Sequence, residues 1–160
     1  MNSKNSLDRL VQNGKLKRQK TDSGHLNDLL EAARRNFEAA SIVRDAADEA
    51  AFKLIYDGLL QICRAVLLLN GFRPDDGEQH KTTFFAAGEI LGPEVDETIR
   101  KIQKFRIKRN DCVYDPRGLI GKSDFEAIYR TARDFWIFVR SFLKKSGGQL
   151  VLFDELPPLC

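Results

Sequence analysis

The chain has 160 residues, of which 42% are hydrophobic and 31% are charged, and its formal net charge is +3. This composition is typical of a soluble globular protein, and the length suffices for one domain with a sizeable core. No uninterrupted apolar run exceeds five residues, whereas a membrane span needs roughly 18. The first residues lack the apolar core of a signal peptide, so a cytoplasmic protein without a membrane segment is expected.

Positive charge is concentrated at the N-terminus. Residues 1–22 contain six basic and two acidic side chains, a net charge of +4, so the other 138 of the 160 residues sum to −1. Such a segment can bind nucleic acid or an acidic partner, or it can be a solvated, mobile terminus. We divide the chain into a basic N-terminal arm (1–22), a folded domain (23–146) and a C-terminal tail (147–160).

The three cysteines, Cys63, Cys112 and Cys160, are widely spaced and form no CxxC pair or cluster with histidine. Zinc sites need such clustered ligands, and therefore neither a metal nor a cofactor is expected. Cys63 and Cys112 occupy apolar faces of predicted helices, where free cysteine behaves as a small hydrophobe. A nucleophilic role is the alternative.

Apolar residues recur at helical spacing along nearly the whole chain, and no other segment alternates as a strand would. In chain order, helices are predicted around 7–11 and over about 23–43, 45–70, 79–91, 93–114 and 123–144. Asn13-Gly14 and Asn70-Gly71 are typical helix ends, and Ser23 is the expected N-cap of the second helix. Residues 73–78 read as a polar turn, and Gly147-Gly148 ends the last helix.

Four of these helices are long and have short connections. They predict an all-α fold, an up-and-down four-helix bundle with short additional helices. The tail that follows is short, apolar and rich in proline near its end. It either docks in a groove of the bundle or awaits a partner.

The helix predicted over 93–114 carries an arginine within its apolar stripe. At about 100° per residue, Val113 lies only about 40° from Arg109. A buried unpaired guanidinium costs several kcal/mol, so Arg109 needs a carboxylate, a bound anion or an interface. Asp57, Asp111 and Asp115 are candidate carboxylates. The alternative is that Arg109 reaches solvent at the bundle end beside a structural salt bridge.

The same helix should stop just after this arginine. Pro116 disfavours helical geometry at Asp115, so the helix is expected to end near Tyr114. As the chain unwinds, Tyr114 and Asp115 would turn back toward Arg109 and form a polar group with Asn110. Arginine and asparagine bind phosphates and bases, and a tyrosine can stack on a base, donate a hydrogen bond or simply pack.

A basic run precedes the arginine. Six cations fall within ten residues: Arg100, Lys101, Lys104, Arg106, Lys108 and Arg109. They form either a solvated helix face or a surface that follows phosphates beside the site. The candidate nucleotide- or RNA-binding residues are therefore Arg106, Lys108, Arg109, Asn110 and Tyr114.

These features resemble the HEPN (higher eukaryotes and prokaryotes nucleotide-binding) superfamily. The similarity rests on Arg109-Asn110 and on the stretch AFKLIYDGLLQICRAVLLLNGFRPDDGEQHKTTFF, with His80 opening its short helix, and it covers about 26–143. The resemblance implies a homodimeric helical bundle in which Arg-x4-His elements of two protomers meet. In active members this element is a metal-independent endoribonuclease, whose arginine holds the scissile phosphate and whose histidine assists proton transfer at the 2′-hydroxyl.

The motif departs from that family at its histidine, because the residue five after Arg109 is Tyr114. A tyrosine with a pKa near ~10 is a poor general base at neutral pH. Arg109, Asn110 and Tyr114 therefore form a catalytic set only if the protein is active. His80 is either a cap or packing residue, or it supports the site.

Three functions remain open from the sequence. The first is a HEPN-like nucleotide- or RNA-binding homodimer, the toxin-like component of a toxin–antitoxin or phage-defence pair; the resemblance implies a nucleotidyltransferase antitoxin as its partner. The second is an active endoribonuclease that uses Arg109 with Tyr114 or with His80. The third is a non-catalytic helical adaptor whose arm and tail are docking segments, which a pairing of Arg109 with Asp57 would favour.

Two isoleucines indicate a protein partner. Ile107 and Ile137 each lie about 160° from the centre of the apolar stripe of their helix. Apolar side chains on an outward face are typical of an interface, and we therefore expect a homodimer.

Overall fold

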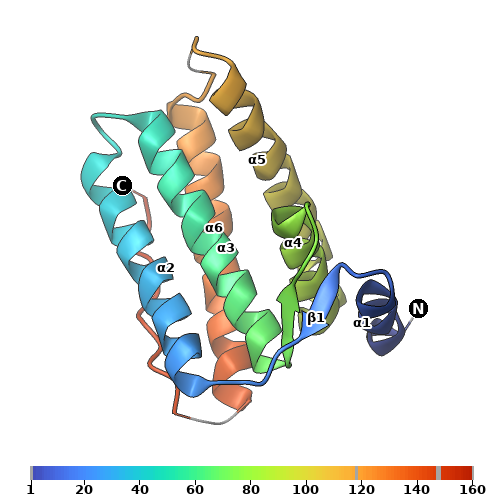
Figure 1. The fold of residues 1–160 in the computed structure, drawn as a ribbon. Coiled ribbons are helices and arrows are strands. Elements are labelled where there is room, and N and C mark those ends of the chain that lie inside the picture. The colour runs from blue at the N-terminus through green and yellow to red at the C-terminus, as the bar shows by residue number, and fades with distance from the viewer. Residues whose placement is uncertain (1, 118, 147–148, 160) are drawn as a thin grey trace.

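A computed structural model describes residues 2–117, 119–146 and 149–159. Its α-helices are α1 (Ser3–Gln12), α2 (Ser23–Val43), α3 (Asp48–Leu69), α4 (Gln79–Leu91), α5 (Asp96–Tyr114) and α6 (Lys122–Lys145). Figure 1 shows the four long helices, α2, α3, α5 and α6, running side by side, with the shorter α4 beside α5. The predicted all-α fold is confirmed. None of the helices in the described part of the chain is long and apolar enough to cross a bilayer.

Most helix ends follow from local sequence signals. α3 is capped by Asn70, whose backbone N–H donates to carbonyls of the last turn, and α4 spans the predicted 79–91. The expected cap of α2 is wrong by one residue, because the side chain of Asp22, not Ser23, accepts hydrogen bonds from the first backbone amides. The helix end predicted at Gly147-Gly148 lies outside the described residues.

The N-terminal segment is not a free arm. After α1, the strand β1 (Leu16–Arg18) pairs antiparallel with β2 (Phe72–Pro74), and the Leu16 side chain is only 1% exposed. The polar turn expected over 73–78 is therefore wrong at its start, which is a strand. Each strand has three residues, too few to show an alternating pattern in the sequence.

α3 is the central helix of the core. It packs against α2, α4, α5 and α6, and the ring of Phe37 lies so close that a Cβ added at Gly58 would be 2.5 Å from it. The absence of a side chain at Gly58 thus allows α2 and α3 to approach closely. Cys63 and Cys112 are free and buried, and burial raises the pKa of the Cys63 thiol, in keeping with a role as small core hydrophobes.

The C-terminal tail docks on the bundle along α2 and α6. Its Phe153 ring stacks on the Trp136 indole, with ring centroids 4.0 Å apart and planes at 6°. The Val151 N–H donates to the Asn27 side chain at 2.9 Å. Three side chains of α6 donate to tail carbonyls: Trp136 to Phe153 and Asp154, Arg133 to Leu156, and Tyr129 to Pro157. Of the two alternatives for the tail, the structure supports docking in a groove.

Candidate nucleotide-binding site

Arg109 of α5 faces Tyr56 of α3, and its guanidinium carbon lies 5.1 Å from the centre of the tyrosine ring. Its Nε is buried and has no hydrogen-bond partner. Within the described part of the chain, Arg109 forms no ion pair. A cation over an aromatic face is favourable, but it does not replace the missing acceptor at Nε. The arginine that the sequence places in the apolar stripe is thus only partly compensated.

His80 is brought to the same place by the start of α4. Its Nδ1 lies 3.0 Å from the Tyr56 hydroxyl oxygen. Burial and then the nearby charges of Arg109 and Arg64 hold the pKa of His80 below its ordinary value, so the imidazole is neutral at pH 7. Burial also raises the pKa of Tyr56, so the phenol keeps its proton and can donate it to Nδ1. In that arrangement the His80 Nε2 carries the hydrogen.

Asp57 adds a carboxylate near this group without neutralising it. Burial raises the pKa of Asp57, although the charge of Arg109 acts in the opposite direction. Among the described residues there is no ion pair between Asp57 and Arg109, and the two side chains interact only by longer-range electrostatics. The pairing that would favour the adaptor hypothesis is therefore not found. Partial burial without a counter-ion makes the charged form of Asp57 costly.

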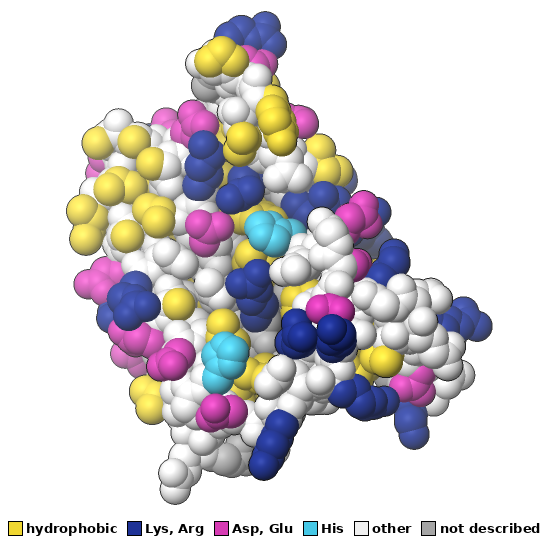
Figure 2. Space-filling view, viewed as in Figure 1, with side chains coloured by type: hydrophobic (Ala, Val, Ile, Leu, Met, Phe, Trp, Pro, Cys, Tyr) yellow, Lys and Arg dark blue, Asp and Glu magenta, His cyan; other side chains and the backbone are white. Residues whose placement is uncertain are grey.

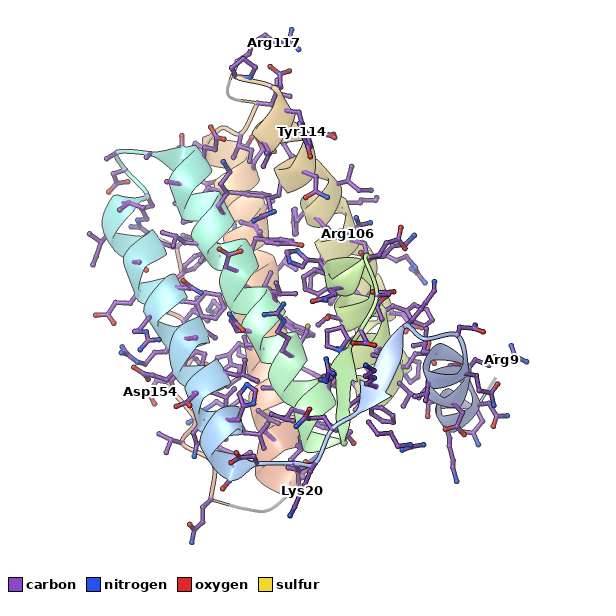
Figure 3. The ribbon with its side chains drawn as sticks, viewed as in Figure 1. Arg9, Lys20, Arg106, Tyr114, Arg117 and Asp154 are labelled. Carbon is purple, nitrogen blue, oxygen red and sulfur yellow. The ribbon has the colours of Figure 1, made fainter. Side chains whose placement is uncertain are left out.

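A surface hollow of about 520 Å³ opens beside His80. It is lined by residues 76–81, Arg106 and Asn110. The Arg106 Nε donates to the Gln103 side chain at 2.7 Å, and the Gln103 amide donates at 3.0 Å to the backbone carbonyl of Lys81. These bonds hold α5 to the start of α4, and Figure 3 shows Arg106 on α5 next to α4. Arg106 and Asn110 thus line one hollow, adjoining the Tyr56–His80 pair.

Tyr114 and Asp115 do not join this group, and the expectation that they turn back toward Arg109 is wrong. Tyr114 is 86% exposed and lies beyond Arg106 toward the end of α5 (Figure 3). The Asp115 carboxylate binds the Arg117 guanidinium at 2.6 Å, which lowers the pKa of Asp115. The reason is that α5 stays helical through Tyr114, which keeps this side chain about 140° from Arg109.

Lys108 points to another neighbour. Its Nζ lies 2.6 Å from the carboxylate of Asp124, in the first turn of α6. On the helical wheel Lys108 is about 160° from Arg106, so the two cannot serve one hollow on α5. Of the five residues predicted for the site, the structure brings together Arg106, Arg109 and Asn110.

Sequence reasoning missed the part that α3 contributes. Tyr56 lies on the buried face of α3, and nothing in the periodicity separates a core tyrosine from one whose hydroxyl reaches a histidine. Figure 2 shows Lys and Arg side chains gathered around histidine in the middle of this face. In the described part of the chain, no group of three or more His, Cys, Asp or Glu side chains could hold a metal ion.

Comparison with known proteins does not identify a relative. No protein-family model, no curated protein and no solved structure matches the chain. Assignment of a function therefore rests on the geometry around Arg109 and on the sequence motifs that resemble the HEPN superfamily.

Proposed function

We propose that this protein is a HEPN-like protein that binds a nucleotide or an RNA phosphate at Arg109 and in the adjoining hollow beside His80, which Arg106 and Asn110 line. The observation that carries this proposal is the buried Nε of Arg109, a charged donor with no acceptor. Phosphate and carboxylate oxygens are the acceptors that a guanidinium binds best. Because Asp57 makes no ion pair with Arg109 in the described structure, a ligand is the acceptor that we infer.

The neighbouring groups suit the same ligand. Arg106 adds a second positive charge, and the Asn110 amide can donate a hydrogen bond to a phosphate or a base edge. His80 offers Nε2–H when Tyr56 donates to its Nδ1. A bound phosphate would also favour protonation of His80, since it supplies the opposite charge that the free site lacks.

The direct test is equilibrium binding of a short labelled RNA and of a nucleoside monophosphate to the purified protein. Binding should be measurable at low ionic strength and should weaken steeply as salt is added, because phosphate contacts release bound counter-ions. If neither ligand binds at low salt, the proposal is refuted.

An active endoribonuclease is the second candidate, and the observation that favours it is the Tyr56–His80 hydrogen bond beside Arg109. General-base attack by a 2′-hydroxyl requires a neutral imidazole with a free lone pair, and His80 has one only in its other tautomer, in which Nδ1–H donates to the Tyr56 hydroxyl and Nε2 can accept the proton. In this hypothesis His80, rather than Tyr114, takes the role of the missing motif histidine.

We expect cleavage of total cellular RNA by the unaltered protein to be absent or very weak. Any cleavage measured on a denaturing gel should disappear in His80→Gln and in Arg109→Ala, and it should persist in Tyr114→Phe. Restoring the family histidine with Tyr114→His should raise activity only if a second protomer brings that residue to Arg109, because within one chain it faces away. Robust cleavage that depends on Tyr114 and not on His80 would overturn this assignment.

A homodimer is part of the proposal. Ile107 is 51% exposed and Ile137 is 37% exposed, on the outward faces of α5 and α6. We expect light scattering to give a dimer mass, and Ile107→Glu to shift it to the monomer mass, because a buried unpaired carboxylate would be costly. Gln12→Glu is the control, since Gln12 is an exposed polar residue of α1 and should accept a carboxylate without a change of mass. A wild-type protein that stays monomeric at high concentration would contradict the dimer.

On the basis of the resemblance, this protein is the toxin-like component of a two-gene system and acts in the cytoplasm. The partner would be a nucleotidyltransferase antitoxin. An adjacent gene that encodes such an enzyme would support this part of the proposal, and co-purification of the two proteins would test it.

A further inference from the structure

A second hollow adjoins the candidate site on the same face. It has a volume of about 270 Å³, and its lining includes the guanidinium-bearing Arg64 of α3 and Arg73 of β2. Leu68 and Phe72, which are both buried, contribute apolar lining. Gln79 lines this hollow and also the hollow beside His80, so the two are neighbours on the surface. We call them the upper hollow, beside His80, and the lower hollow.

Arg64 lines the lower hollow, and its guanidinium is unpaired among the described residues. In the described part of the chain it forms no ion pair and no hydrogen bond. Its charge nevertheless reaches the upper hollow, where it lowers the pKa of His80 and opposes the rise in the pKa of Asp57. Arg64 is therefore half-buried, close to the site, and free to bind an anion.

The two short strands add a second source of positive charge. Lys17 and Arg73 are directly opposite each other in the antiparallel pair, and both bind the single carboxylate of Asp75, at 3.1 and 3.3 Å. Like charges opposite each other destabilise a strand pair, and one carboxylate neutralises only one of them. The strand pair thus keeps an excess positive charge next to the lower hollow.

Figure 2 shows how these charges are arranged on the surface. Lys and Arg side chains continue from the middle of this face toward its lower edge, where Figure 3 labels Lys20. Two acidic groups line the upper hollow: Glu78 lies 3.9 Å from Lys81, whereas Asp76 accepts from Thr82 at 2.7 Å through Oδ2 and keeps a buried Oδ1 without a partner. Cationic side chains therefore line both hollows, Arg106 and Lys81 in the upper one and Arg64 and Arg73 in the lower one.

We infer that the ligand is a single strand of nucleic acid that occupies both hollows, an inference that rests on the proposed function. One phosphate lies beside Arg109 and Arg106, and a neighbouring phosphate lies between Arg64 and Arg73. From Tyr56, beside Arg109, to Arg64 the rise along α3 is about 12 Å, which a few nucleotides can span. Gln19, which the sequence placed in a separate arm, lines the lower hollow and is thereby part of the binding surface.

The apolar part of the lower hollow distinguishes a single strand from a duplex. Leu68 and Phe72 can contact only a base that is unstacked and turned outward, and a duplex keeps its bases inside. A mononucleotide, in contrast, would fill the upper hollow and leave Arg64 and Arg73 without a phosphate. Affinity should consequently depend on the length of the strand.

The experiment compares a labelled dinucleotide with a labelled octanucleotide of the same base composition by fluorescence anisotropy. We expect the octanucleotide to bind at least about tenfold more tightly, since it adds charge-assisted contacts. Arg64→Gln and Arg73→Gln should each weaken octanucleotide binding by about tenfold and lower its salt dependence by about one counter-ion. Arg73→Gln should leave dinucleotide binding unchanged, and Arg64→Gln, whose charge reaches the upper hollow, should weaken dinucleotide binding much less than octanucleotide binding. Arg109→Gln should weaken binding of both lengths.

Arg130→Gln is the matched control, because Arg130 is an exposed arginine of α6, which lies behind α3 in Figure 1. Circular dichroism checks that each variant is folded. If Arg109→Gln abolishes binding while Arg64→Gln and Arg73→Gln behave like Arg130→Gln, the inference fails and the proposed function stands. If neither oligonucleotide binds the wild type, both fail.

Two further binding measurements identify the source of the phosphates. An RNA and a DNA octanucleotide of equivalent sequence separate recognition of the shared phosphodiester backbone from recognition of the 2′-hydroxyl. Polyglutamate tests for an acidic protein instead. If polyglutamate binds with the same dependence on Arg64 and the oligonucleotides do not bind, the surface belongs to a protein partner and the inference is overturned.

Discussion

Replacing Arg109 with alanine is expected to abolish nucleotide binding and to leave the helical fold intact. Each hydrogen bond to a charged group contributes about 1.5–3 kcal/mol, so losing two of them from one guanidinium should weaken binding by at least about a hundredfold. The fold should tolerate the change, since within the described chain Arg109 holds no ion pair and carries an unfilled buried Nε. Fluorescence anisotropy measures the first effect and far-ultraviolet circular dichroism the second.

The loss of the contact between Arg109 and Tyr56 limits how far Arg109→Ala can destabilise the fold. A cation over an aromatic ring contributes about 0.5–2 kcal/mol, so the free energy of unfolding should fall by no more than that amount. Removing the positive charge should at the same time raise the pKa of His80, because Arg109 is one of the groups that depress it. Titration of the His80 ring by NMR spectroscopy checks this shift independently of any ligand.

Arg109→Lys separates charge from geometry. Lysine keeps the positive charge but lacks the planar fork of donors, so we expect only partial recovery of binding. Arg130→Ala, far from the site on α6, should bind as the wild type does. If Arg109→Ala unfolds the protein and the wild type binds no nucleotide at low salt, the arginine is structural and there is no site.

The features that could be predicted from the sequence are those encoded by neighbouring residues. The end of α5 at Tyr114 follows from Pro116, and the break between α4 and α5 follows from Gly92-Pro93, because these residues restrict the backbone locally. The position of Arg109 in an apolar stripe likewise follows from a helical period of 3.6 residues. Predicting each of these three features requires no knowledge of the rest of the fold.

The features that could not be predicted depend on segments far apart in the chain. The three-residue strands pair with each other across more than fifty residues and carry no pattern of their own. His80 reaches Tyr56 because α4 returns alongside α3, which periodicity cannot determine. Tyr114 was misplaced for a related reason, since the sequence shows where a helix ends but not where the side chain at its end points.

Trp136→Ala is expected to have the largest effect on stability, lowering the free energy of unfolding by about 3–5 kcal/mol. The indole is fully buried, stacks on Phe153, and donates through Nε1 to the carbonyls of Phe153 and Asp154. Alanine would leave a cavity, leave these carbonyls without their donor, and release the tail from α6. Urea denaturation followed by circular dichroism measures the loss without relying on the fluorescence of the removed tryptophan.

Three variants divide this effect into its parts. Trp136→Phe keeps an aromatic ring for the stack but loses the donor, so it should cost about 1–3 kcal/mol. Phe153→Ala removes the other half of the stack and should shift the wild-type Trp136 emission toward that of a solvent-exposed indole. Val151→Ala is the matched control on the tail, because its side chain is 74% exposed and should leave both stability and emission unchanged. If a chain that ends at Ser146 unfolds at the same urea concentration as the full chain and its tryptophan emission does not move, the tail contributes nothing to the fold and its docking in this groove is refuted.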